Sequence, residues 1–227
     1  MNIPVKKQHG MKAKIKSFIE NVTRPAEVFN PSSLNDEIAM KTEWSSLSTS
    51  STNFKTHNLV EKGPNRMEFK TALGAKIFVF LFMVIGLAVP VIFHMVPDAE
   101  LGSGGIWPLY IFGGIFFLVG AVMHYVQTSP IVFDKLEGFY WGGRKKPELH
   151  HTNEQLKHAA RIRSIYAIQI LSRRVSSSKS SYTCYEINLV LRDGSRLNVI
   201  AHAGGKAIKE NAETLGRFLG VPVWDAS

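Results

Sequence analysis

The stretches IFVFLFMVIGLAVPVIFHMV, residues 77–96, and IWPLYIFGGIFFLVGAVMHYV, residues 106–126, contain no Lys, Arg, Asp or Glu. As a helix, about 20 apolar residues span the roughly 30 Å hydrocarbon core of a bilayer. The link between the two stretches, residues 97–105, is too short to hold a domain. We therefore expect a transmembrane helical hairpin over residues 77–126, with any recognition or chemistry in the two hydrophilic flanks.

The distribution of basic residues predicts the orientation of this hairpin. Twelve Lys and Arg precede the first apolar stretch, fifteen follow the second, and the link contains none. Because Lys and Arg concentrate on the cytoplasmic side of a membrane, both termini are expected in the cytoplasm. The single cysteine, Cys184, excludes an intrachain disulfide and agrees with flanks in a reducing compartment.

Small residues on both apolar stretches predict that the two helices pack closely against each other. Gly86 lies on the first stretch, and Gly113 and Gly120 lie seven residues apart on the second. Small side chains let two helix backbones approach in a membrane. We expect these three glycines to be helix-packing positions.

The N-terminal flank changes character along its length. Residues 11–22 have the pattern of a short basic amphipathic helix that lies on an anionic membrane, or of a poorly ordered terminus. Residues 1–52 as a whole are basic and rich in Ser and Thr, which predicts a partly disordered linker. Residues 53–76 then contain two short strand patterns around Gly63, Pro64 and Asn65, which predicts a juxtamembrane β-hairpin.

The C-terminal flank, residues 127–227, has the length and pattern of a folded domain. Its clearest signal is an alternation from Tyr185 to Ala201 interrupted by Asp193-Gly194, which predicts a β-hairpin with a two-residue turn and one buried face. Residues 206–219 then follow a helical period. The expected fold class is an α+β membrane protein: a two-helix hairpin, a small antiparallel sheet and a C-terminal helix that caps it.

This outline resembles a family of uncharacterised bacterial inner-membrane proteins, in which a two-helix hairpin precedes a domain like the pleckstrin-homology (PH) domain. The resemblance rests on residues 131–142, 165–171, 185–199 and 212–224, including the phrases YEINLVLRDGSRLNV and LGRFLGVPVWD. It covers roughly residues 70–225 and carries no catalytic signature. It implies a multi-pass protein of the bacterial inner (cytoplasmic) membrane with a membrane-tethered recognition domain.

No pattern in the sequence indicates catalysis, a metal site or a cofactor. The histidines His150, His151 and His158 lie in a polar segment without a second ligand cluster, so we expect solvated side chains and no metal. Motifs of hydrolases and nucleotide-binding loops are missing, and an enzyme is not expected. The net charge of +9 is largely explained by the positive-inside bias, so nucleic acid is not an expected partner either.

The expected function is a non-catalytic, membrane-anchored module that serves recognition or assembly. The preferred partner, besides the bilayer, is a membrane protein or a second copy of the chain, because a tethered domain needs no lipid affinity to stay at the membrane. The first alternative is binding of anionic lipid headgroups. Its candidate residues are Arg144, Lys145, Lys146, Arg173 and Arg174. The second alternative is a small subunit of a transport complex.

Overall fold

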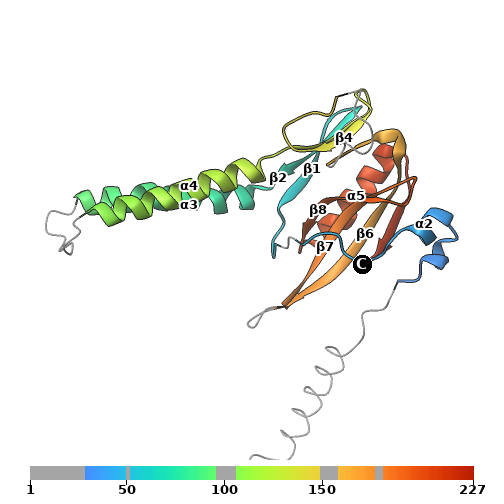
Figure 1. Ribbon diagram of the computed structural model, residues 1–227, viewed down its shortest axis with the longest axis horizontal. Coiled ribbons are helices and arrows are strands. Elements are labelled where there is room, and N and C mark those ends of the chain that lie inside the picture. The colour runs from blue at the N-terminus through green and yellow to red at the C-terminus, as the bar shows by residue number, and fades with distance from the viewer. Residues whose placement is uncertain (1–28, 50–51, 96–105, 149–157, 177–180) are drawn as a thin grey trace, which may run out of the picture. The chain divides into compact units, whose positions relative to one another are not determined.

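The structure is a computed structural model that describes residues 29–49, 52–95, 106–148, 158–176 and 181–227 (Figure 1). The amphipathic pattern of residues 11–22 and the histidines His150 and His151 lie outside these residues. The chain divides into two units, residues 1–40 and 41–227. In the first unit, the 3-10 turn η1 (Pro31–Leu34) precedes helix α2 (Glu37–Lys41), whose first turn is capped by the Asp36 carboxylate.

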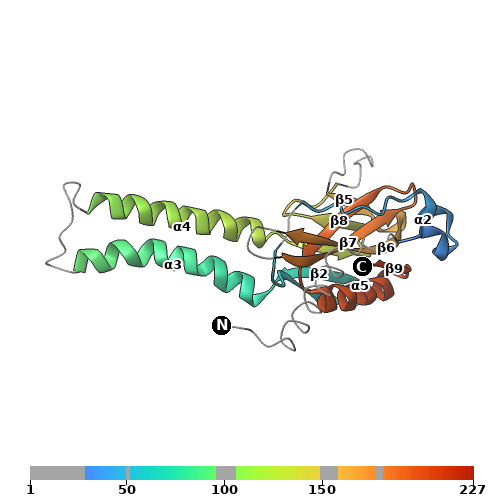
Figure 2. The same ribbon diagram turned by 90° about the horizontal axis from the view of Figure 1, so that it is seen from below.

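Two long apolar helices form a hairpin, α3 (Leu73–Met95) and α4 (Trp107–Gln127) (Figure 2). Both are long and apolar enough to cross a membrane. Gly86, Gly113 and Gly120 lie at the contact between the two helices. A Cβ added to Gly86 would lie 2.6 Å from the Gly113 carbonyl oxygen. The helix backbones therefore touch at positions that accept no larger residue.

The first sheet is antiparallel and is built from both flanks of the helical hairpin. Strand β2 (Arg66–Thr71) precedes α3 in the chain and pairs with β3 (Ile131–Asp134), which follows α4, with Met67 opposite Phe133. The strands expected as a separate juxtamembrane hairpin are therefore part of the same sheet as the first strands of the C-terminal flank. In spatial order the sheet contains β1 (His57–Gly63), β2 (Arg66–Thr71), β3 (Ile131–Asp134), β4 (Phe139–Gly142) and β5 (Ala159–Arg161).

The second sheet is mixed, which corrects the expectation of a purely antiparallel domain. After helix α5 (Gly205–Leu219), Gly220 adopts a φ of 73° and turns the chain back to the sheet. The last strand, β9 (Val223–Ala226), then lies beside β6 (Ile165–Ser176) and runs parallel to it, because the helix has carried the chain back along the sheet. In spatial order the sheet contains β8 (Arg196–His202), β7 (Ser181–Leu191), β6 (Ile165–Ser176) and β9 (Val223–Ala226).

The main core lies between the two sheets and α5. Phe69 and Phe133 from the first sheet and Ile187 from the second belong to one cluster of fully buried side chains. Helix α5 packs onto the second sheet through Ile208 and Leu215, both without exposed surface, as its helical period predicts. The predicted C-terminal helix is thus confirmed, and one core joins elements from both sides of the helical hairpin.

Candidate functional site

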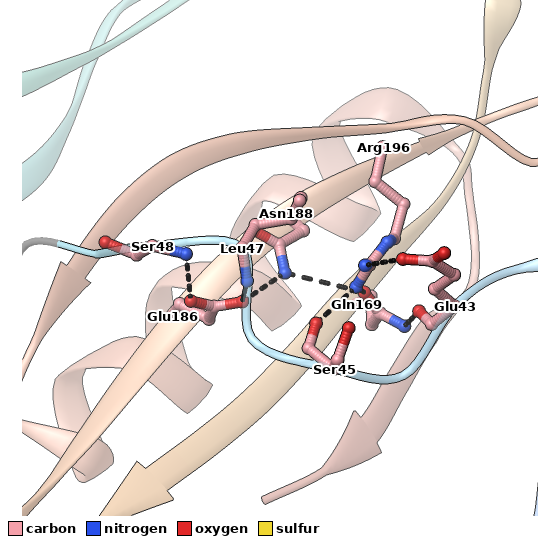
Figure 3. A network of polar contacts seen from close by, with 8 residues as sticks. All are labelled: Glu43, Ser45, Leu47, Ser48, Gln169, Glu186, Asn188 and Arg196. Carbon is pink, nitrogen blue, oxygen red and sulfur yellow. Dashed lines mark hydrogen bonds and ion pairs between the residues drawn. The ribbon is translucent and has the colours of Figure 1, made fainter. Parts of the chain in front are cut away.

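The outer face of the second sheet, opposite α5, is polar and yet buried. Gln169 on β6 and Glu186 and Asn188 on β7 are at most 2 % exposed. The alternation along β7 predicted one buried face, with Glu186 and Asn188 in water, and for these two residues the prediction is wrong. The cause is that residues 42–49, here called the docked segment, cross this face without regular secondary structure and with a bend at Ser45 (Figure 3).

Glu186 holds the middle of the docked segment. Its carboxylate accepts hydrogen bonds from the Leu47 N–H at 2.9 Å, the Ser48 N–H at 3.0 Å and the Ser46 hydroxyl at 2.7 Å. The amide of Asn188 donates a fourth bond at 2.7 Å. A buried carboxylate is costly unless its oxygens are hydrogen-bonded, and here four donors share that task.

Arg196 on β8 and Gln169 hold the first half of the docked segment by its carbonyl groups. The Arg196 guanidinium donates to the Ser45 carbonyl at 2.7 Å, and the Gln169 amide donates to the Glu43 carbonyl at 3.0 Å. Arg196 also pairs with the Glu43 carboxylate at 3.2 Å; the arginine side chain is 4 % exposed and the glutamate 80 %. The positive charge of Arg196 is thus covered by the segment that it binds.

A short chain of amide contacts ties the polar face together. The Asn198 amide donates to the Asn188 side-chain oxygen at 2.9 Å. The Asn188 amide nitrogen in turn donates to the Gln169 side-chain oxygen at 3.4 Å. Beside this network, Trp44 of the docked segment packs against Trp224 of β9 with ring centroids 5.8 Å apart. The face therefore offers fixed polar groups flanked by an aromatic surface.

The sheet holds the docked segment largely through the backbone of that segment. Two N–H groups and two carbonyl groups of the docked segment are bound by side chains of the sheet. By contrast the Leu47 side chain is 39 % exposed. The side-chain contacts named above are those of the Ser46 hydroxyl, the Trp44 ring and the Glu43 carboxylate, and the four other bonds are made by main-chain groups of the segment.

The basic residues predicted to contact lipid headgroups belong to two different parts of the fold, the segment after β4 and strand β6. Arg144 donates to the Tyr125 carbonyl and the Thr128 hydroxyl, both at 2.9 Å, so it caps the C-terminal end of α4. Its neighbour Lys146 pairs with Glu137. Lys145 is exposed. Arg173 and Arg174 lie on β6 in the other sheet, where Arg174 donates to Ser181.

The turn between β7 and β8 has three residues, Arg192 to Gly194, where two were predicted. The Leu191 N–H donates to the Ser195 carbonyl, and the Gly194 N–H donates to the Leu191 carbonyl, each at 2.9 Å. Gly194 has a φ of 84°. Hydrogen bonds from Ser195 to the Asp193 carboxylate fix the turn and lower the pKa of Asp193. Gly194, the residue with a positive φ, is the third residue of the loop, as in three-residue hairpins, and not the second residue of a two-residue turn.

Replacing Gly194 with Val is expected to lower the free energy of unfolding of the full chain by about 1–2 kcal/mol, because a β-branched residue is strained at this φ. A Cβ there would come no closer than 3.5 Å to its nearest neighbour, so the cost is conformational. Asn tolerates a positive φ, and Gly194→Asn is the matched control with a smaller loss. Urea unfolding of the detergent-solubilised protein measures both; equal losses would contradict this account of the turn.

Histidine His202 at the end of β8 is fully buried and neutral. Its Nδ1 accepts a hydrogen bond from the Gly204 N–H at 3.0 Å, which a protonated ring cannot do. Burial, with smaller contributions from His57 and Lys55, lowers the pKa of His202 to about 4. Burial also lowers the pKa of His57.

Acid is therefore expected to destabilise the fold between pH 6.5 and 4. In that window the unfolded chain, with an ordinary His202 pKa of 6.5, binds a proton that the folded chain does not. Stability from this group is complete above pH 6.5 and falls as the pH is lowered. Urea midpoints at pH 7 and 4.5 measure the effect, and His202→Gln should reduce the difference. A wild-type midpoint that does not change with pH would be inconsistent with a buried neutral His202.

Metal and thiol chemistry find no support among the described residues. No group of three or more His, Cys, Asp or Glu side chains comes together there, and the segment containing His150 and His151 is not described. Cys184 is buried, and burial raises the pKa of its thiol. The described feature with the most specific polar chemistry is therefore the face that holds the docked segment.

Neither a protein-family model nor a curated protein matches this chain. What supports a function is thus the geometry described above.

Proposed function

We propose that this protein is a membrane-anchored, non-catalytic recognition or assembly module whose folded domain binds a polypeptide segment without regular secondary structure. The observation that carries the proposal is the capture of the docked segment by Glu186, Gln169 and Arg196 through its backbone. In the described structure the occupant of this face is the chain's own segment. The same contacts suit a segment of a partner or of a second copy that follows the same bent course.

The surface of the helical hairpin supports the membrane anchor. Leu73, Leu87 and Leu118, for example, are each more than 60 % exposed, and large exposed side chains continue along both helices. So much contiguous apolar surface is unfavourable in water and favourable in the hydrocarbon core of a bilayer. With both basic flanks in the cytoplasm, the proposed location is the inner membrane of a bacterium.

Reporter fusions test this orientation. Fusions after Asn53 and after Ser227 should report the cytoplasm, and an insertion at Gly104 should report the opposite side, because the basic residues lie only in the two flanks. Each site is fused to two enzymatic reporters, one active only in the cytoplasm and one active only on the opposite side. Opposite results from the two reporters at each site are the internal control. A Ser227 fusion on the outside would overturn the two-span arrangement.

Polypeptide recognition is favoured over binding of anionic lipid. Arg144, Lys146 and Arg174 have partners within the protein, whereas the docked segment shows polypeptide contacts directly. The role of a transport subunit requires several copies, because two helices per chain do not enclose a pore. Both alternatives predict no affinity of the sheet face for a peptide.

A peptide exchange experiment tests the proposed function. The probe is a fluorescent synthetic peptide with the sequence KTEWSSLST, residues 41–49. The receptor is the full chain carrying Leu47→Pro and Ser48→Pro, which remove the two N–H groups bound by Glu186. Because Arg196 and Gln169 still contact the segment, trypsin cleavage after Lys41 first establishes that the face is free. Saturable binding is expected, at least tenfold weaker after an added Glu186→Ala, since 1.4 kcal/mol corresponds to a factor of ten.

The wild-type chain, whose own segment fills the face, is the matched control and should bind the peptide weakly. Circular dichroism establishes that each receptor is folded. A folded receptor with a free face that does not bind the peptide, or that binds it equally with and without Glu186, would refute the proposal.

A further inference from the structure

A groove on the helical hairpin lies where α3 begins and α4 ends, at the end of the hairpin that joins the sheets (Figure 2). Its volume is about 420 Å³. It is lined by Lys76, Ile77, Phe80 and Met83 of α3 and by His124 of α4. At 1.5 Å per helical residue, Met83 lies about 10 Å further along α3 than Lys76. The groove therefore starts at a basic end and continues along an apolar wall.

The basic end of the groove is held at the junction between the helices and the first sheet. Lys76 lies in the first turn of α3 and His124 in the last turn of α4. Next to them the Thr71 hydroxyl at the end of β2 donates to the Gln127 carbonyl at the end of α4, at 2.6 Å. In the orientation proposed above, this junction lies at the cytoplasmic surface of the bilayer. The apolar wall then faces the hydrocarbon of the cytoplasmic leaflet.

Two further lysines gather beside Lys76. The Lys62 side chain on β1 approaches Lys70 on β2 and is the largest cause of a lowered pKa of Lys70, and the charge of Lys76 lowers that pKa further. The Glu68 carboxylate opposes this shift, but Arg66 pairs with Glu68 at 2.8 Å. Within the part of the chain that the structure describes, none of the three lysines forms an ion pair with a carboxylate.

This lysine cluster, Lys62, Lys70 and Lys76, is complementary to an anion. Like charges at close range repel one another, and an anion placed among them removes that cost. The positive-inside bias explains why lysines occur on this side of the membrane, but it does not require their side chains to come together. A phosphate group suits the cluster because its oxygens accept charge-assisted hydrogen bonds from ammonium groups.

The apolar wall selects an anion that carries a hydrocarbon chain. Ile77 and Phe80 are exposed on the surface of α3. A soluble anion would leave this wall without a contact, whereas a phospholipid places its phosphate at the membrane surface and its acyl chains in the hydrocarbon. A zwitterionic lipid brings a cation of its own next to its phosphate, which the lysines repel. Basic pockets between transmembrane helices on the cytoplasmic side are known sites for anionic lipid headgroups.

We propose that this groove binds one anionic phospholipid of the cytoplasmic leaflet, with its phosphate beside Lys76 and His124 and an acyl chain along Phe80 and Met83. The inference rests on the membrane anchor proposed above. None of these residues is among the basic positions that the sequence suggested for lipid contact. Because the lysine cluster includes residues of β1 and β2, the same headgroup contacts both the helical hairpin and the first sheet. The bound lipid thus links the anchor to the folded domain.

Native mass spectrometry of the full chain in a mild detergent tests this inference. The probes are phosphatidylglycerol and phosphatidylcholine with identical acyl chains, titrated separately. We expect one molecule of phosphatidylglycerol to bind about tenfold more tightly than phosphatidylcholine, because each basic residue near a headgroup favours the anionic lipid. Glycerol 3-phosphate, which has the anionic group without the chains, should not displace it.

Substitutions in the lysine cluster should remove this preference. Lys70 and Lys76 are exposed, so Lys70→Gln combined with Lys76→Gln removes two charges without disturbing the core. The two lipids should then bind with nearly equal affinity. The matched control, Lys206→Gln combined with Arg217→Gln on α5, removes two charges from exposed positions elsewhere and should keep the preference. Circular dichroism establishes that both variants retain the helix content of the wild type.

Three results would overturn the proposal: equal affinity of the wild type for both lipids, a preference that survives in the Lys70 and Lys76 variant, or displacement of the lipid by glycerol 3-phosphate. An equal loss in the control variant would overturn it as well, because net charge alone would then explain the preference. A chain recovered in the soluble fraction of its host would overturn the membrane anchor together with this inference. Peptide binding at the face of Glu186 does not depend on the lysine cluster and is measured separately.

Discussion

Replacing Glu186 with Ala is expected to lower the free energy of unfolding of the full chain by about 2–4 kcal/mol and to release residues 42–49 from the sheet. The carboxylate accepts bonds from two backbone N–H groups, a hydroxyl and an amide at 2.7–3.0 Å. Bonds to a charged group are stronger than neutral ones, and removing the acceptor leaves four donors without their partner.

Urea unfolding measures the loss of stability, and trypsin cleavage after Lys41 measures release of the segment. Glu213→Ala on the exposed surface of α5 is the matched control and should change neither. Glu186→Gln keeps one acceptor and is expected to fall between Ala and wild type. If Glu186→Ala unfolds like wild type and resists trypsin equally, the docked segment does not depend on this carboxylate.

Replacing Gly86 with Val is expected to destabilise the helical hairpin by about 2–3 kcal/mol. A Cβ at Gly86 would lie 2.6 Å from both the Gly113 carbonyl oxygen and the Phe117 nitrogen. These are backbone atoms that cannot rotate away as a side chain does, so α3 and α4 must separate. Separation loses the close packing that holds helices together in a membrane.

The chain contains a control for this substitution. Gly114 lies next to Gly113 on α4 but is exposed, and a Cβ there meets nothing within 4 Å. Gly114→Val should therefore leave stability nearly unchanged despite the same loss of a glycine. Thermal or detergent-induced unfolding, followed by circular dichroism, compares the two. Equal effects would mean that the helices do not meet at Gly86.

Local patterns in the sequence predicted most individual elements. The two uncharged apolar stretches gave the long helices, and the period of residues 206–219 gave α5. Strand patterns around the glycine-containing turns located the strand pairs β1–β2 and β7–β8. These signals are local because each depends on periodicity or on backbone freedom at one turn.

Pairings between distant segments were not predictable from such signals. The pairing of β2 with β3 joins strands that are separated in the chain by the whole helical hairpin. The pairing of β9 with β6 depends on the path of α5, which brings the chain back along the sheet. Composition favoured a linker for residues 1–52, whereas residues 42–49 are held in place by long-range contacts. The Ser46 hydroxyl in this segment donates to the Glu186 carboxylate, which lies about 140 residues away in the chain. Composition within the segment does not reveal an acceptor at that distance.

One signal in the sequence hinted at the docked segment: Trp44 is a large aromatic residue in a polar stretch. Glu186 and Asn188 gave no hint, because they occupy positions of β7 that are expected to face water. Arg144 was predicted to contact lipid, but in the structure it caps the C-terminal end of α4. The Tyr125 carbonyl that accepts its hydrogen bond lies 19 residues earlier, so no local pattern indicated this contact.

The most direct test of the account is residue-resolved amide hydrogen exchange at Leu47 and Ser48 in the full-length protein in detergent micelles. The account predicts slow exchange of both amides, because each donates to the buried Glu186 carboxylate, and fast exchange in Glu186→Ala. Exchange of both wild-type amides at the rate of an unstructured peptide would contradict the claim that this sheet face binds a polypeptide segment through its backbone.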